Sequence, residues 1–249
     1  MAGAELELRD IHLPGRLHGI SGDIQPAMLT CLVGPNGVGK SSLLEVICGL
    51  VSPEQGRVLL QGTVLHGRDI RALARLRAYL PQQINRDLGF SGAEVLGMAC
   101  YPGLAQSQAL LDEQIELFDL GPLLNRPLSV LSGGECQRLQ IARTLLQILS
   151  VNAEGLILLD EPLAGLDIQY QLRLMQFLRD LTQRGSTVVM ALHDINLARL
   201  YGHNAWLLER GHLRYSGPAR DVLSPEHIQQ VFAVPMTLTH GQLLWPEPR

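Results

Sequence analysis

Short segments of the chain carry residue types and spacings that suit phosphate chemistry. GPNGVGKS, residues 34–41, fits G-x-x-x-x-G-K-[ST], a pattern whose glycines let backbone N–H groups turn inward onto phosphates. The candidate nucleotide-binding residues of this segment are Gly34, Pro35, Asn36, Gly37, Val38, Gly39, Lys40, Ser41 and the following Ser42. Lys40 is the only lysine among 20 basic residues, and a slim ammonium enters a tight loop more easily than the planar fork of arginine. The pattern predicts that Lys40 reaches the β- and γ-phosphates of a nucleotide and that Ser41 ligates Mg²⁺.

A second segment, LILLDE at residues 156–161, places two adjacent carboxylates at the end of an apolar run. Asp160 would hold Mg²⁺ through water, and Glu161 would polarise a water that attacks the γ-phosphate. Taken alone, such a segment is more often a solvated turn before a proline. Together with the phosphate loop, it favours the catalytic interpretation.

A third segment, LSGGECQR, begins at residue 131 and combines a helix start with a glycine pair. Ser132 and Glu135 have the spacing of a capping box. Gly133 and Gly134 expose backbone N–H groups at the expected helix N-terminus, where an anion is favoured. Taken alone, the segment is more simply interpreted as a capped helix N-terminus without a ligand. In a chain that also has a phosphate loop, it predicts a second phosphate-binding turn.

Strands and helices that alternate along the chain would position these segments. Apolar runs at residues 28–33, 155–159 and 186–192 indicate buried strands, and the first leads directly into the glycine-rich loop. A helix should follow that loop, with Leu43, Leu44, Ile47 and Leu50 on its apolar face, and Ile168, Leu172, Met175 and Leu178 should mark one face of another helix that stops near Gly185. This order predicts an α/β fold with a mostly parallel sheet and ligands at the carboxyl ends of its strands.

The middle of the chain has a different pattern. From about residue 84 to 150 strand signals vanish and helical spacing dominates, as at 110–120 and 135–149, which indicates an inserted helical lobe. The tail from residue 205 shows only short strand-like runs around Gly202, Gly211 and Gly217.

Composition narrows the class of protein. The chain has 249 residues, of which 46% are hydrophobic and 18% charged, and its net charge is -4 without a block of like charges. These values favour a globular protein and give no support to a nucleic-acid footprint or a polybasic membrane anchor. Its cysteines, Cys31, Cys48, Cys100 and Cys136, form no C-x-x-C pair, and the N-terminus has no signal-peptide pattern, so we expect a cytoplasmic location with reduced thiols.

In their order and spacing the motifs resemble the ATP-binding cassette (ABC) family over essentially the whole chain. By that resemblance GPNGVGKS is the Walker A loop, LSGGE the signature, LILLDE the Walker B strand with its catalytic glutamate, and AGLD, ending at Asp167, the D-loop. Gln82 in YLPQ corresponds to the Q-loop glutamine, which contacts nucleotide and metal, and His193 to the switch histidine. Each of these two residues, seen alone, would be taken for an ordinary surface amide or strand-end histidine.

The resemblance also implies an architecture. It predicts a single ABC ATPase domain over residues 1–249, with a P-loop NTPase core and antiparallel β subdomain in 1–83 and 151–249 and the helical lobe in 84–150. Cassettes of this family bind ATP and Mg²⁺ as head-to-tail homodimers, in which the signature of one subunit covers the ATP of the other. The family's adenine-stacking aromatic is absent from IHLPGRLHG, and His12, Leu13 and Arg16 remain as alternatives for a contact with the base.

Within the family the chain is most similar to import ATPases, which implies a peripheral position on the cytoplasmic face of the inner membrane. Two permease subunits and a periplasmic binding protein would be its partners, and residues from Gln83 to about Met98 would face the permease. Vitamin B12 is the expected cargo, with a ferric siderophore or haem as the alternative and a role in iron–sulfur assembly as a more distant one. A nucleotide kinase would share only the Walker A loop with this chain. It therefore ranks third, after a transporter ATPase and a non-transport ABC ATPase.

Overall fold

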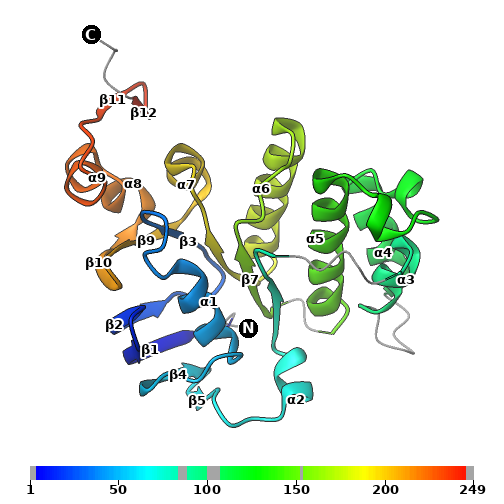
Figure 1. The fold of residues 1–249 in the computed structure, drawn as a ribbon, viewed down its shortest axis with the longest axis horizontal. Helices are drawn as coiled ribbons and strands as arrows, with labels where there is room; N and C mark the ends of the chain where they lie inside the picture. Colours follow the sequence, from blue (N-terminus) through cyan, green and yellow to red (C-terminus); the bar gives the residue numbers. More distant parts are fainter. Residues whose placement is uncertain (1–3, 84–88, 100–106, 152–153, 245–249) are drawn as a thin grey trace.

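A mostly parallel sheet of six strands forms the centre of the computed structural model, which describes residues 4–83, 89–99, 107–151 and 154–244 (Figure 1). The strands run in the order β10 (His212–Pro218), β9 (Asn204–Glu209), β3 (Leu29–Val33), β8 (Thr187–Ala191), β7 (Leu156–Asp160) and β6 (Arg77–Leu80). All neighbouring pairs from β9 to β6 are parallel, and only β10 is antiparallel to its neighbour. The expectation of an α/β fold with a mostly parallel sheet is therefore confirmed.

The central strands are apolar throughout because both faces of the sheet are covered. Every residue of β3, β7 and β8 is buried. Along β7, Leu156 and Leu158 pack on the side of α1 (Lys40–Cys48), whereas Ile157 and Leu159 pack on the side of α5 (Gly133–Leu149) and α6 (Ile168–Gln183). Since successive strand side chains point to opposite faces, the same short strands contribute to two hydrophobic cores.

A second, antiparallel sheet packs against α1. Its order is β2 (Leu17–Ile24), β1 (Leu6–Leu13), β4 (Gln55–Leu60) and β5 (Thr63–Val64), followed in the chain by the short helix α2 (Ile70–Ala74). Leu6 and Ile20 of this sheet share a core with Leu43 and Ile47 of α1. In Figure 1 these strands lie beside α1, which confirms the expected antiparallel β subdomain. The turn between β1 and β2 thereby lies next to the glycine-rich loop that precedes α1.

Helices make up the region between β6 and β7, as the helical spacing predicted. They are α3 (Gly92–Gly97), α4 (Ser107–Leu117), two 3₁₀ turns (Gly121–Leu123 and Leu128–Val130) and α5. Figure 1 shows them grouped at one end of the molecule, beyond the β6–β7 edge of the sheet. The start of the expected lobe, at residues 84–88, and Cys100 lie outside the described residues, and the proposed bounds of 84–150 stay a prediction.

Two expected apolar faces are only partly buried. Leu50 is 61% exposed because α1 ends at Cys48, two residues earlier. Ile168 is 73% exposed and Leu172 is also exposed, whereas Met175 and Leu178 are fully buried. The first turns of α6 start beyond the carboxyl end of β7, so no strand lies beneath them. The spacing located the helix correctly, and only the C-terminal half of its apolar face is buried.

The C-terminal region contains more structure than its sequence indicated. The runs around Gly211 and Gly217 form the β9–β10 hairpin, which follows α7 (Ile195–Tyr201). The short helices α8 (Ala219–Val222) and α9 (Pro225–Phe232) and the hairpin of β11 (Thr237–Thr239) and β12 (Gln242–Leu244) were not predicted. Among the described residues, no helix has the length and apolar character needed to cross a membrane.

Candidate nucleotide-binding site

The glycine-rich loop connects β3 to α1 in a conformation that requires glycine. Gly39, at the N-cap of α1, has φ +105°, and a Cβ there would come within 2.9 Å of the Arg16 carbonyl oxygen. Lys40 is 5% exposed, and its Nζ donates hydrogen bonds to the carbonyl oxygens of Gly34 at 2.8 Å and Pro35 at 3.1 Å. Burial lowers the pKa of Lys40, and the charges of Glu161 and Asp160 partly oppose this shift. The ammonium therefore points into the loop, where the helix N-terminus favours phosphate.

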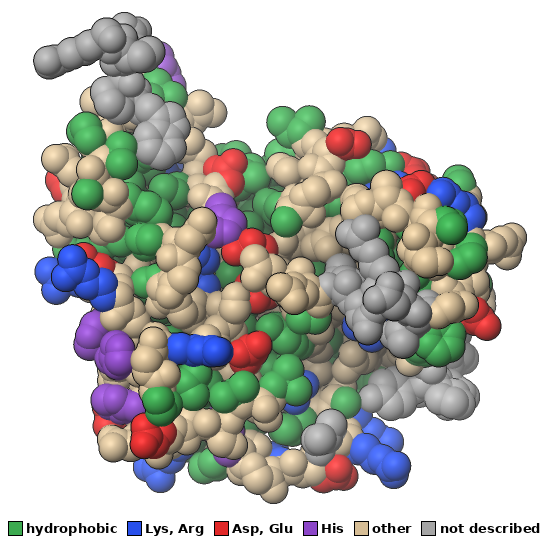
Figure 2. Space-filling model, in the orientation of Figure 1, with side chains coloured by type: hydrophobic (Ala, Val, Ile, Leu, Met, Phe, Trp, Pro, Cys, Tyr) green, Lys and Arg blue, Asp and Glu red, His purple; other side chains and the backbone are tan. Residues whose placement is uncertain are grey.

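This loop borders a cavity of about 490 Å³ at the carboxyl ends of the parallel strands. The lining residues are Arg16, Asn36, Gly37, Gly39, Lys40, Ser41, Ser42, Gln82, Glu161 and His193. Figure 2 shows acidic, basic and histidine side chains gathered in the middle of this face, between the regions of α7 and α6. The structure therefore brings most of the predicted nucleotide-binding and catalytic residues to one hollow.

Glu161 occupies the centre of a contact among three strand ends. Its Oε2 accepts a hydrogen bond from Gln82 Nε2 at 2.8 Å, and its Oε1 is hydrogen-bonded to His193 Nε2. These residues follow β6, β7 and β8, whose carboxyl ends meet at the same edge of the sheet. Glu161 has φ +50°, a left-handed conformation that is uncommon for a residue with a side chain and is found more often at functional sites. The arrangement can hold a carboxylate in a fixed orientation toward a water.

Asp160 and Ser41 fit a magnesium ion. Asp160 is 1% exposed, the Ser41 hydroxyl hydrogen-bonds its carboxylate, and its Oδ1 has no hydrogen-bond partner among the described residues. Burial raises the pKa of Asp160, and the Ser41 hydroxyl opposes the shift. An unpaired buried carboxylate oxygen is costly unless a ligand occupies it. No cluster of three or more acidic, histidine or cysteine side chains that could hold a metal occurs in the described ranges.

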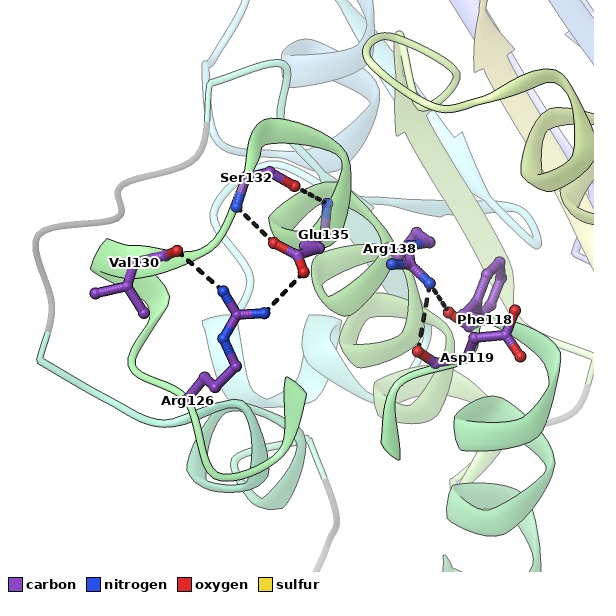
Figure 3. Close-up of polar contacts among 7 residues, drawn as sticks. All are labelled: Phe118, Asp119, Arg126, Val130, Ser132, Glu135 and Arg138. Carbon is purple, nitrogen blue, oxygen red and sulfur yellow. Dashed lines mark hydrogen bonds and ion pairs between the residues drawn. The ribbon is translucent and has the colours of Figure 1, made fainter. Parts of the chain in front are cut away.

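The predicted capping box is present at the start of α5 (Figure 3). The Ser132 hydroxyl accepts from the Glu135 backbone N–H, and Glu135 Oε2 accepts from the Ser132 N–H at 2.7 Å. Glu135 Oε1 also accepts from Arg126 Nη1 at 2.8 Å, and both partners lower the pKa of Glu135. The carboxylate is thus occupied within its own lobe, and we expect it to shape the turn while Ser132, Gly133 and Gly134 face an anion.

The structure does not bring every predicted residue to the cavity. Its lining does not include the following nucleotide-binding candidates: Gly34, Pro35, Val38, Ser132, Gly133, Gly134, Glu135 and Asp167. Asp160 also lies outside the lining, and Asp167 is at the N-cap position of α6 without a side-chain capping hydrogen bond. The glycine-rich loop and the signature turn therefore do not line one cavity within a single chain.

Direct contacts nevertheless connect the signature helix to the segment after Glu161. A Cβ on Gly134 would come within 2.6 Å of the Gly165 carbonyl oxygen, so the two backbones touch. Gln137 Nε2 donates to the Pro162 carbonyl at 3.1 Å, and Gln171 of α6 donates to the carbonyl of Leu166 at 3.0 Å. The N-terminal part of α5 therefore packs directly on the segment that follows Glu161.

The sequence left three candidate residues for a contact with the nucleotide base, and the structure reduces this set. His12 Nε2 is hydrogen-bonded to Asp10 Oδ1 at 3.0 Å, and Leu13 packs against the core between α1 and the antiparallel sheet. Of the three alternatives only Arg16 lines the cavity. No sequence signal singled it out, because the turn between β1 and β2 reaches the cavity only through the packing of the antiparallel sheet on α1.

We expect Gly39→Ala to lower the melting temperature of the nucleotide-free protein more than Gly37→Ala does. Both glycines have positive φ, but a Cβ at position 37 meets nothing within 4 Å, whereas at position 39 it meets Leu17 at 2.8 Å and the Arg16 carbonyl at 2.9 Å. Backbone strain costs about 1–3 kcal/mol in either variant, and the clash adds to it at position 39 alone. Thermal unfolding followed by circular dichroism compares the two, and equal melting temperatures would contradict the contact.

A parallel sheet, a glycine-rich loop around a lone lysine and paired carboxylates at the strand ends define a P-loop nucleotide-binding protein. Residues 17–164 match the family model described as ABC transporter. The chain is 36% identical over 237 residues to the hemin import ATP-binding protein HmuV of Rhizobium meliloti (strain 1021), covering 92% of this chain and 90% of that protein. It is 38% identical over 231 residues to the vitamin B12 import ATP-binding protein BtuD of Citrobacter koseri, covering 92% of each. The chain belongs to the ABC transporter family, as an ATP-binding subunit.

Solved structures agree on the fold. An ATP-binding subunit of an ABC transporter superimposes with a TM-score of 0.78 at 22% identity, covering 92% of this chain and 93% of that one. A nucleotide-free ATP-binding cassette gives a TM-score of 0.73 at 20% identity, covering 93% and 96%. The expected P-loop fold is thereby confirmed.

Proposed function

We propose that the protein is the ATP-hydrolysing subunit of an importer whose cargo is vitamin B12. The observation that carries the hydrolytic part is the position of Glu161, whose carboxylate is held by Gln82 and His193 beside the loop of Lys40. Haem is a second candidate cargo, because relatives named for hemin and for vitamin B12 match the chain at similar identity. Both molecules are metal tetrapyrroles, which gives the two candidates a common chemistry.

The roles of the site residues follow from their chemistry. Glu161 would orient and polarise the attacking water, and His193 and Gln82 would fix its orientation. Lys40 and the N–H groups of the loop would stabilise negative charge on the phosphates. Ser41 and Asp160 would hold Mg²⁺, with Gln82 as a further ligand, and the ion would neutralise phosphate charge.

The separation of the two phosphate-type turns supports a working homodimer. The signature of one subunit would close over the ATP held by the other, and the contact between Gly134 and Gly165 would connect that signature to the hydrolytic strand of its own subunit. ATP would then act as a bridging ligand whose hydrolysis opens the dimer.

The proposed partners are two permease subunits and, through them, a periplasmic binding protein. In this assembly the protein is peripheral to the cytoplasmic face of the inner membrane. The stretch from Gln83 to Met98 is the proposed permease contact; its residues 84–88 lie outside the described part of the chain, and α3 lies within it. No role in nucleic-acid binding or iron–sulfur assembly is proposed.

Reconstitution in vesicles tests the cargo. We expect the protein, assembled with its own permease and binding protein, to drive ATP-dependent cobalamin uptake, and we expect cargo to increase ATP hydrolysis because a loaded binding protein shifts the population of closed dimers. Lys40→Ala, which removes the ammonium, is the inactive control. If haem is taken up and cobalamin is not, haem replaces vitamin B12 as the proposed cargo. If the protein forms no complex with a permease and supports iron–sulfur assembly instead, its role in import is overturned.

A further inference from the structure

Arg16 is a cation at the nucleotide cavity, and the sequence left only a contact with the base open for it. It lines the cavity together with Lys40, and within the described ranges it forms no ion pair. Its guanidinium makes one side-chain hydrogen bond to the described part of the chain, from Nη1 to the Ser42 hydroxyl at 3.3 Å. Most of its donors are therefore directed to solvent or to a ligand.

The backbone of Arg16 is held in place from two sides. A Cβ on Gly39 would lie 2.9 Å from the Arg16 carbonyl oxygen, and a Cβ on Gly211 would lie 2.7 Å from it. The Arg16 N–H donates to the Leu13 carbonyl at 3.0 Å, which closes the turn between β1 and β2. The residue is thus fixed against the glycine-rich loop even though its side chain is exposed.

The contact with Ser42 shows which part of a nucleotide the guanidinium can reach. Ser42 lies in the first turn of α1, whose free N–H groups would hold phosphate. Glu161, the candidate hydrolytic residue, is hydrogen-bonded to Gln82 and His193, whereas the guanidinium of Arg16 bonds Ser42. A cation beside Ser42 is therefore placed at phosphates that ATP and ADP share, and a guanidinium suits the bidentate geometry of a phosphate.

We propose that Arg16 is a second phosphate-binding cation that contacts the α- or β-phosphate of the nucleotide and sets the affinity for ATP and ADP alike. The inference rests on the proposed nucleotide site and deepens it. It assigns to Arg16 a contact with phosphate, where the sequence had left a contact with the base open. Since the same phosphates are present before and after hydrolysis, the contact would lower the Kd of both nucleotides without changing kcat.

Isothermal titration of the full chain with ATP, ADP and inorganic tripolyphosphate tests this role. For Arg16→Ala we expect all three Kd values to rise by a similar factor of about tenfold to a hundredfold, the usual effect of a lost charge-assisted hydrogen bond. Arg16→Lys, which keeps the charge, should recover part of the affinity. Arg71→Ala, which removes an exposed arginine outside the cavity, is the matched control and should bind normally.

The alternatives give different results. Tripolyphosphate has no base, so unchanged tripolyphosphate binding with weakened ATP binding would place the guanidinium on the base and overturn the proposal. Unchanged affinity for ATP and ADP would also overturn it. A lower melting temperature of nucleotide-free Arg16→Ala, without recovery of affinity by Arg16→Lys, would show a structural role instead. The titrations need neither hydrolysis nor transport, so their outcome is independent of whether the protein powers an importer.

Discussion

Glu161→Gln is expected to bind ATP and Mg²⁺ but to hydrolyse ATP at least about 100-fold more slowly than the unchanged protein, as is usual when a general base is lost. The amide has almost the same shape, and its oxygen can still accept the hydrogen bond that Gln82 Nε2 donates at 2.8 Å. It lacks the negative charge that polarises water. The substitution therefore separates nucleotide binding from the chemical step.

A second consequence of Glu161→Gln is a change of oligomeric state. If ATP bridges two subunits and hydrolysis releases them, a variant that binds but does not hydrolyse should accumulate as a dimer with ATP and Mg²⁺. Light scattering coupled to size-exclusion chromatography measures the mass, and phosphate release measures turnover. Glu54→Gln, at an exposed position outside the cavity, is the control. Near-normal turnover of Glu161→Gln would remove Glu161 from the catalytic role.

The elements that position the site were predictable because they are short and strongly patterned. The strands that precede Gly34, end at Asp160 and precede His193 are continuous apolar runs, as expected for strands covered on both faces. The capping box of Ser132 and Glu135 is local, so four residues suffice to specify it. The sequence therefore contains most of the information needed to place the phosphate loop and the carboxylates.

Contacts between distant segments were less accessible. The burial of α6 depends on where the helix begins relative to the sheet, and periodicity cannot show that Ile168 extends beyond the strands. The helices α8 and α9 are too short for a periodic signal to stand out. Gln82 and His193 lie 79 and 32 residues from Glu161. The family resemblance assigned both residues to the nucleotide site, but no local pattern indicated that they meet at one carboxylate.

Arg16 is a residue of the site whose contacts with distant segments could not be predicted from the local sequence. Its residue type suits a phosphate, but 19 further basic residues share the chain, and nothing local marks this one. Its proximity to Gly39 and Ser42 follows from the packing of one sheet on α1, which becomes visible only in three dimensions. The lone lysine, in contrast, is unusual in the composition as well as in its motif.

The lone lysine permits a selective chemical test. An amine-directed acylating reagent can modify only the ε-amine of Lys40 and the chain terminus. Since burial lowers the pKa of Lys40, a larger fraction of its amine is unprotonated and nucleophilic at a given pH, and labelling should accelerate as the pH rises toward that lowered pKa. Bound ATP should protect Lys40, because its phosphates occupy the loop, while labelling of the terminal amine continues as an internal control.

Loss of ATPase activity should therefore track modification of the peptide that contains Lys40. Mass spectrometry measures this modification with and without saturating ATP.

Lys40→Arg should also reduce turnover, by about 100-fold as for removal of one transition-state charge donor. The side chain at this position is 5% exposed and its Nζ lies between two backbone carbonyls, at 2.8 and 3.1 Å, where the wider guanidinium does not fit. Labelling of Lys40 that is unaffected by ATP, or normal turnover of Lys40→Arg, would contradict the assigned phosphate cradle, because either result would place the triphosphate away from the ammonium.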